Sequence, residues 1–140
     1  MNDFALDPRL AGDAHLVGDL DLSRLLLMND ARFPWLILVP RRHALRDLID
    51  LAHDDQHALL DEINRCAHVL HALDKPDKLN IAALGNVVAQ LHVHVIARYA
   101  RDPAWPRPVW NVGTAEGYSP EALYRRLGTL RTALRIEPGA

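Results

Sequence analysis

The sequence has one cysteine, no long apolar run and no large excess of either charge, and each shortage excludes a class of protein. The lone Cys66 cannot form an internal disulfide or a cysteine cluster around zinc, so we expect a reducing, cytoplasmic setting. No apolar stretch approaches the ~20 residues that span a bilayer, and the acidic start of the chain lacks the basic and apolar regions of a secretory signal. A formal net charge of −2 argues against non-specific binding to nucleic acid. We therefore expect small anions as ligands, with no membrane and no nucleic acid as partner.

The chain has enough apolar residues to bury a core, since 49% of its 140 residues are hydrophobic. We expect one domain over residues 1–140. Apolar patterning predicts a short strand at residues 15–17, a second at 24–29 and a third at 35–39, which Pro40 closes. Turn-forming residues between the second and third strands predict a hairpin.

A long helix is predicted next. Apolar residues recur at helical spacing at Leu59, Leu60, Ile63, Cys66, Ala67 and Leu70. We expect Asp54 or Asp55 to cap the start of this helix and residues 74–77 to end it. Residues 78–84 are predicted as a further strand.

The end of the chain predicts a loop and a second helix. Residues 101–110 contain three prolines and two tryptophans, a composition typical of an irregular loop. Ser119, Pro120 and Glu121 have the order of cap, proline and acid that begins a helix, and leucines at 123, 127, 130 and 134 form its apolar stripe.

Residues 90–98, Gln-Leu-His-Val-His-Val-Ile-Ala-Arg, carry the strongest functional signal. Their alternation predicts a strand whose odd-numbered residues face a core, so that Gln90, His92 and His94 share the opposite face. Same-face neighbours on a strand lie roughly 6 to 7 Å apart, close enough for both imidazoles to touch one phosphate or one metal ion. With this strand the order β-β-β-α-β-β-α predicts an α+β domain. We expect a mainly antiparallel five-stranded sheet, one long helix and a C-terminal helix.

The paired histidines could also be solvated surface groups on an exposed strand, or part of a zinc site. Zinc needs three or four protein ligands. The pair His53/His57 lacks the glutamate of the zinc-protease motif, and His68/His71 adds no further ligand. We expect no metal centre and no cofactor.

Three separated pieces of the chain occur in one informative order. The first is Asn29 ahead of a strand that ends in Pro-Arg-Arg-His at 40–43, the second is Asn80 on the strand before the histidines, and the third is residues 85–98. Together they resemble the histidine triad (HIT) family of nucleotide hydrolases and transferases. The family signature is His-φ-His-φ-His-φ-φ, with φ apolar, and here Gln90 stands at its first histidine. Trp35 also departs from the pattern, because many members carry another histidine at the start of that strand.

The resemblance implies catalytic roles for the motif residues. His92 falls at the family's nucleophile and His94 at the histidine that contacts phosphate, while Gln90 is expected to support the substrate or its neighbours. A neutral imidazole is a good nucleophile near pH 7, so His92 could attack the α-phosphorus of a nucleotide. In the family the other ring nitrogen of the nucleophile usually donates its proton to a backbone carbonyl. The product is a nucleotidyl-histidine that water converts to a nucleoside monophosphate.

Substrate contacts are implied for four further residues. Asn29 resembles the residue that reaches the ribose, Asn80 and Asn86 lie before the motif, and Arg98 at its end could meet phosphate. Asn86 stands where glutamine is usual. Asn29 could instead be a turn residue, Asn80 a strand-ending residue and Arg98 a solvated cation.

The tryptophans after the motif, Trp105 and Trp110, could shape the site or stack on a base. We favour the alternative that they anchor the proline-rich loop on the core, because tryptophan is mostly buried. The resemblance also implies a homodimer paired through the long helix and the neighbouring strand.

The leading functional prediction is an enzyme with a small-molecule nucleotide substrate. It would hydrolyse a phosphoanhydride or a phosphoramidate, as a dinucleoside polyphosphate hydrolase or a nucleoside phosphoramidase does. The second prediction is a nucleotide-binding module with little or no turnover, because Gln90 and Trp35 depart from the usual site. A metal-dependent His-x-His protein on a barrel is a third, which the long helix between strands disfavours.

Overall fold

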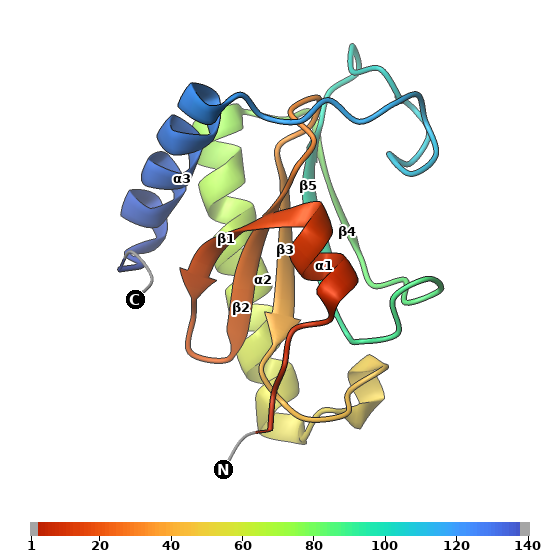
Figure 1. The fold of residues 1–140 in the computed structure, drawn as a ribbon, viewed down its shortest axis with the longest axis vertical. Coiled ribbons are helices and arrows are strands. Elements are labelled where there is room, and N and C mark those ends of the chain that lie inside the picture. The colour runs from red at the N-terminus through yellow and green to blue at the C-terminus, as the bar shows by residue number, and fades with distance from the viewer. Residues whose placement is uncertain (1–2, 138–140) are drawn as a thin grey trace.

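The computed structural model describes residues 3–137 of the chain. In these residues five strands form one sheet with the order β1-β2-β3-β5-β4 (Figure 1). The strands are β1 (Ala14–Asp19), β2 (Ser23–Met28), β3 (Trp35–Pro40), β4 (Lys78–Ala82) and β5 (Val93–Arg98). Each pairing between neighbours is antiparallel, which confirms the predicted α+β class and its antiparallel sheet. The predicted hairpin between the second and third strands is also confirmed.

Helices cover both faces of the sheet. The long helix α2 (His53–Asp74) and the C-terminal helix α3 (Pro120–Leu134) lie side by side against one face, and the short helix α1 (Pro8–Asp13) lies on the other (Figure 1). A single turn of 3-10 helix, η1 (Leu48–Asp50), precedes α2. Among the described residues no helix is long and apolar enough to cross a membrane.

Three local predictions are wrong. The cap of α2 is Ala52, and both predicted caps lie in the first turn, where their charge suits the positive end of the helix dipole. Asp55 binds the guanidinium of Arg42 with its carboxylate instead of capping. Leu60 is 52% exposed and not part of the buried stripe.

The third wrong prediction is the start of the histidine strand, because β5 begins only at Val93. Helix α1 was not predicted. Asp7 caps it by accepting a hydrogen bond from the backbone N–H of Arg9, with Pro8 at the first helical position, but six residues are too few to show a helical period.

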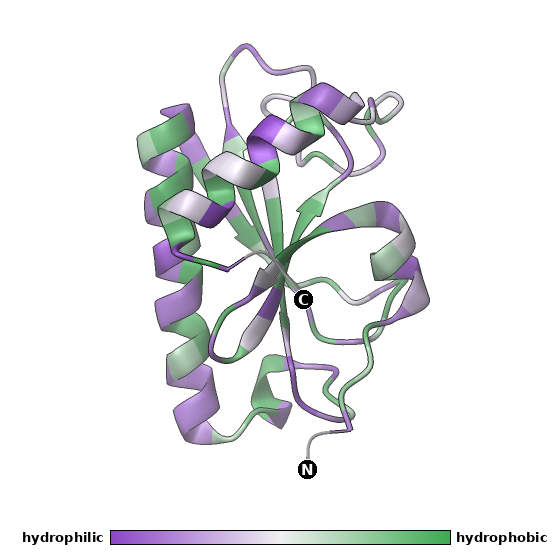
Figure 2. Ribbon diagram, turned by 60° about the vertical axis from the view of Figure 1, so that its left-hand side comes forward, coloured by the Kyte–Doolittle hydropathy of each residue, from purple (hydrophilic) through white to green (hydrophobic). Residues whose placement is uncertain are grey.

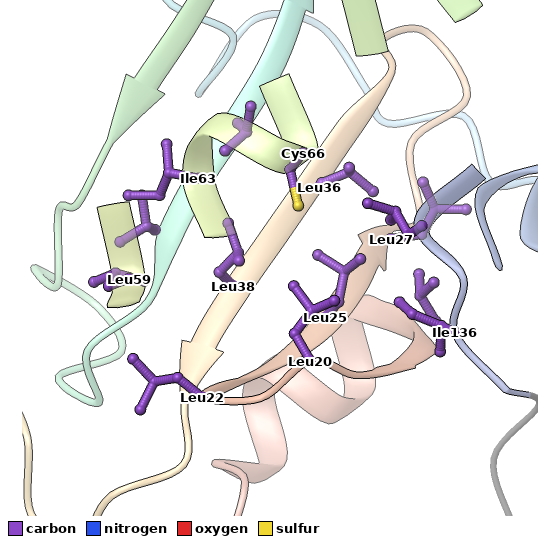
Figure 3. Packing of buried hydrophobic residues seen from close by; sticks show 14 of the residues in the cluster. Leu20, Leu22, Leu25, Leu27, Leu36, Leu38, Leu59, Ile63, Cys66 and Ile136 are labelled. Atoms are coloured by element: carbon purple, nitrogen blue, oxygen red, sulfur yellow. The ribbon is translucent and has the colours of Figure 1, made fainter. Parts of the chain in front are cut away.

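The main core lies between the sheet and the two long helices. Alternate leucines of β2 and β3 meet Leu59, Ile63 and Cys66 of α2 (Figure 3). Leu70 of α2 belongs to the same buried cluster. Figure 2 shows the strands as largely hydrophobic and α2 as alternating between hydrophilic and hydrophobic residues. Burial raises the pKa of the Cys66 thiol to about 12, so this cysteine is a core residue and not a nucleophile.

A buried carboxylate fixes α2 to the β1–β2 hairpin. Glu62 is 7% exposed and accepts hydrogen bonds from the backbone N–H groups of Leu22 (2.8 Å) and Ser23 (3.0 Å). These bonds satisfy two buried donors at the hairpin and set the position of the helix relative to the sheet.

A second core covers the opposite face of the sheet, the face that carries His94. Leu10 of α1 packs there with residues of β2, β3 and β5 and with Ala104 and Val109 of the loop that follows β5. The strand β5 is therefore buried on both faces, and its functional side chains project into a protein environment.

Candidate active site

The two motif histidines lie together at the start of β5. His94 pairs with Ile37 of β3 and with Ala82 of β4, and His92 directly precedes the strand. Their ring centroids are 5.0 Å apart and the rings are steeply inclined at 71°. His92 is 7% exposed and His94 is 4% exposed. The structure thus brings the pair together as the sequence predicted, in a largely desolvated position.

The backbone fixes the proton of His92. Its Nδ1 lies 2.6 Å from the carbonyl oxygen of Gln90. A carbonyl oxygen only accepts hydrogen bonds, so Nδ1 carries the proton and donates it. In neutral His92 the lone pair is then on Nε2, which leaves that nitrogen able to attack an electrophile.

Trp35 fixes the tautomer of His94, which is opposite to that of His92. Trp35 lies two residues from Ile37, on the same face of β3, and therefore diagonally across from His94. Its indole Nε1–H donates to Nδ1 of His94 at 2.9 Å. An indole nitrogen only donates, so Nδ1 of His94 must be unprotonated and the proton of the neutral ring is on Nε2.

The surroundings of His94 also disfavour its charged form. Trp110 packs edge-on against its ring, with centroids 5.0 Å apart, and against Trp35 as well. Burial, together with the neighbouring His92, lowers the pKa of His94 to about 4. At neutral pH His94 is an uncharged donor through Nε2–H. Trp110 therefore shapes the site as well as anchoring its loop.

Gln90 is held by backbone groups that are distant in the sequence. Its side chain turns to the N-terminal segment, where Oε1 accepts from the backbone N–H of Asp7 (2.8 Å) and the amide donates to the carbonyl of Ala5 (2.9 Å). Residue 90 lies before β5, which begins at Val93, so the strand alternation used in the prediction does not extend to Gln90, and its catalytic role stays a prediction. The backbone carbonyl of Gln90 is the part that touches a motif histidine.

Arg98 and Asn80 bind each other and the protein. The guanidinium of Arg98 forms a two-pronged ion pair with Asp102 (2.8 and 3.1 Å) and donates to Asn80 Oδ1 (2.8 Å) and to the carbonyl of Arg107 (2.7 Å). Arg98 is 1% exposed. Burial alone would raise the pKa of Asp102, but hydrogen bonds from Arg98 and from nearby backbone N–H groups lower it to about 2. This network fastens the loop after β5 to the sheet.

The remaining predicted substrate residues lie in loops. Asn29 accepts a hydrogen bond from the backbone N–H of Tyr118 (3.0 Å) and packs against Gly117, so it joins the β2–β3 turn to the segment before α3. Asn86 is exposed in the loop between β4 and β5. Substrate binding by these two residues, and by Asn80 and Arg98, stays a prediction.

A cavity of about 330 Å³ lies beside His92. Its lining combines apolar residues with one cation and one anion: Arg46, Asp47, Leu48, Ile49, Ala83, Leu84, Gly85, Leu91 and His92. The residues around η1 were not predicted as part of the site because they carry no motif; only their position just after the third strand could have indicated them. A larger hollow along α3, of about 1110 Å³, includes none of the predicted site residues.

Metal ligands are not grouped in the part of the chain that the structure describes. No set of three or more His, Cys, Asp or Glu side chains is arranged there to hold an ion. His53 and His57 do approach each other, with their Nε2 atoms 3.2 Å apart on the exposed start of α2. Two imidazoles alone supply too few ligands for a zinc site.

Comparisons with known proteins agree on one family. The model of the HIT domain matches residues 9–101. The crystal structure of a histidine triad protein from Bradyrhizobium japonicum is 46% identical, with a TM-score of 0.91, and the match covers 94% of this chain and 98% of that one. A histidine triad protein from Sinorhizobium meliloti is 44% identical, with a TM-score of 0.91 and 95% and 98% coverage. One from Marinobacter aquaeolei is 42% identical, with a TM-score of 0.92 and 94% and 96% coverage.

A search of curated proteins gave no match. The domain match spans the sheet, the long helix and both motif histidines, and the crystal structures extend the similarity over almost the whole chain. The chain belongs to the histidine triad (HIT) domain family.

Proposed function

We propose that the protein is a nucleotide hydrolase that acts through a nucleotidyl-histidine intermediate on His92. The substrate would contain a phosphoanhydride or a phosphoramidate bond to the α-phosphorus of a nucleotide. The observation that carries the proposal is the hydrogen bond from His92 Nδ1 to the Gln90 carbonyl, which leaves the lone pair on Nε2.

In the first step His92 Nε2 attacks the α-phosphorus. A P–N bond forms, the bond to the leaving group breaks, and its electron pair departs with the leaving group. The imidazole becomes positively charged, and its Nδ1–H still donates to the Gln90 carbonyl, a contact that strengthens as the charge develops. In the second step water attacks phosphorus and loses a proton to solvent. The P–N bond breaks with its electron pair returning to Nε2, so that neutral His92 and a nucleoside monophosphate are released.

His94 supports the same reaction with its Nε2–H. This donor is fixed by the indole of Trp35 and lies next to His92, where it could bind an oxygen of the phosphoryl group as negative charge grows. The proposed contribution is electrostatic: a positioned donor in a largely desolvated site needs no reorganisation during the reaction. Asn86 is exposed in the loop before the motif, so of the proposed substrate contacts it is the one that a ligand in solution can reach most easily.

The test is intact-protein mass spectrometry after brief incubation with diadenosine tetraphosphate and, separately, with an adenosine phosphoramidate. Chromatography follows the release of AMP, and His92→Ala serves as the control. An acid-labile nucleotidyl adduct, or AMP release, that is absent in the control is the expected result. Turnover near the original rate in His92→Ala would overturn the assignment of the nucleophile.

A nucleotide-binding module without turnover is the second candidate. It is favoured by the low exposure of the two histidines, 7% and 4%, and by the replacement of imidazole at Gln90 and Trp35. Another family member, from Sulfolobus tokodaii, is described as a histidine triad nucleotide-binding protein, at 15% identity. Binding of both nucleotides without adduct or product would favour this candidate.

We also propose a homodimer formed through the edge of the sheet. Strand β4 is an edge strand, and Ile81 on it is 50% exposed. An open edge offers unpaired backbone groups to a second copy. Leu60 of α2, at 52% exposure, would add apolar area to the same contact if the dimer pairs as the family resemblance implies. Light scattering with Ile81→Lys, which should yield monomers, tests this assembly.

A further inference from the structure

The hydrogen bond between Trp35 and His94 restricts where His94 can carry a proton. We propose that the enzyme is specific for anionic, weakly basic leaving groups such as phosphate or polyphosphate, and that Trp35 sets this preference by preventing His94 from acting as a general acid. The inference rests on the proposed nucleotidyl transfer at His92 and decides between its two substrate classes.

The positions of the protons around His94 follow from its hydrogen bonds. The indole N–H of Trp35 points at His94 Nδ1 from 2.9 Å, so a proton on that nitrogen would place two donors against each other. The imidazolium form would lose the hydrogen bond and gain this repulsion, in a ring that is 4% exposed and packed against Trp110. The low pKa of His94, about 4, is the expected result of its burial and of the nearby His92.

The other groups around His94 do not replace it as an acid. His92 uses Nδ1–H on the Gln90 carbonyl and must keep Nε2 free for attack. Trp35 and Trp110 cannot give up a proton near neutral pH. The charged groups that line the cavity beside His92 are Arg46 and Asp47. An arginine does not release its proton near pH 7.

The two classes of leaving group differ in the protonation that they need in order to depart. When a phosphoanhydride breaks, the P–O electron pair stays on a phosphate oxygen, which is stable as an anion because phosphate ionises near pH 6. A neutral donor such as His94 Nε2–H is sufficient there. When a phosphoramidate breaks, the P–N electron pair must leave on nitrogen, and an alkyl amine departs only after that nitrogen has received a proton. General acids typically contribute 10²–10⁴-fold to such steps.

The experiment compares kcat/KM for diadenosine tetraphosphate with that for an adenosine 5′-phosphoramidate of a primary alkyl amine. We expect the original protein to favour the anhydride by roughly 100-fold or more, the factor that a missing general acid removes. In Trp35→His an imidazole replaces the indole and can accept as well as donate, so the preference should fall by roughly 10-fold or more.

Trp110→Phe is the matched control. Trp110 touches His94 and Trp35 through its ring edge but makes no hydrogen bond to His94 among the described contacts, so the ratio of the two kcat/KM values should stay the same. A change of the ratio in Trp110→Phe equal to that in Trp35→His would assign the effect to packing and overturn the role of the hydrogen bond.

Nitrogen NMR of the His94 ring gives a readout that does not depend on turnover. Between pH 5 and 8 we expect the Nε2–H tautomer throughout in the original protein and a titrating ring in Trp35→His. Equal kcat/KM for both substrates would overturn this inference and leave the proposed function standing. No adduct and no product from either substrate would overturn the proposed function, and the inference with it.

Discussion

Replacing Gln90 by leucine separates two possible roles of the residue that stands at the family's first histidine. Leucine has a similar size but can neither accept from Asp7 N–H nor donate to the Ala5 carbonyl. The backbone carbonyl that orients His92 is unchanged by the substitution. We therefore expect the N-terminal segment to loosen while His92 remains able to form its nucleotidyl adduct.

The magnitude follows from the two lost hydrogen bonds. Each intramolecular hydrogen bond contributes about 1 kcal/mol net, so the segment should open more easily by about 2 kcal/mol. Because about 1.36 kcal/mol corresponds to a tenfold change in an equilibrium constant, a loss of about 2 kcal/mol makes the open state of the segment roughly 30-fold more populated. Global stability should change less, because Leu10 and the rest of the second core still hold α1 when the amide is gone.

Amide hydrogen exchange measures this opening directly. The N–H of Ala11 bonds to the Asp7 carbonyl at 3.1 Å, so its protection reports whether α1 and its cap are formed. Gln90→Glu is the matched variant: it keeps an acceptor for Asp7 N–H and loses only the donor to Ala5, so about half of the effect is expected. Unchanged protection of Ala11 together with loss of the His92 adduct in Gln90→Leu would refute this reasoning and place the Gln90 amide on the substrate.

Three further predictions concern stability. Asp102→Asn should lower the free energy of unfolding by about 3 kcal/mol, because it leaves the buried guanidinium of Arg98 without its counter-charge; a chemical denaturation midpoint equal to that of the original protein would contradict this. Glu62→Leu should cost roughly 2–4 kcal/mol by leaving two buried N–H groups of the hairpin unsatisfied, and Glu62→Gln should cost less because one acceptor remains. His94 should destabilise the fold in mild acid. Its pKa is about 4 in the folded protein, against an ordinary histidine value of 6.5, so the unfolded chain binds a proton that the folded protein does not. The free energy of unfolding should therefore fall by about 3 kcal/mol as the pH drops from about 6.5 to 4. Urea titrations across this range should show a shallower pH dependence in His94→Gln, whereas Asp102 contributes to acid sensitivity only below about pH 3.8.

The fold was predictable wherever a pattern extended over several residues. Repeated apolar residues mark elements that are buried in the main core. These are the leucines of β2 and β3 and the residues at helical spacing from Leu59 to Leu70. The structure has these elements within a few residues of the predicted bounds. Helix α1 and the true cap of α2 were missed because each depends on one or two residues. Ala52 caps without a side-chain hydrogen bond, so no residue type marks it.

The candidate site was predictable as a pair of histidines but not as a network. His92 and His94 are two residues apart at the start of β5, and this short spacing brings their rings together. The partners of these rings come from elsewhere in the chain: Trp35 lies 59 residues from His94, and the amide of Gln90 reaches residues 83 and 85 positions away. Spacing within one motif cannot give such contacts. Arg98 illustrates the opposite error, since an arginine at the end of the motif suggests phosphate binding, whereas Asp102 four residues later takes its charge.

The two departures from the family motif have a common chemical consequence. Where the family carries imidazoles, this chain has an indole at Trp35 and an amide at Gln90, and neither group exchanges protons near neutral pH. The protons of His92 and His94 are each held in one place, one by a carbonyl that can only accept and the other by an indole that can only donate. A proton therefore has no route through these four side chains to a departing group. Restoring a route needs an imidazole next to His94, so Trp35→His should change the leaving-group preference by itself, whereas Gln90→His alone should not, because the indole would still occupy His94 Nδ1.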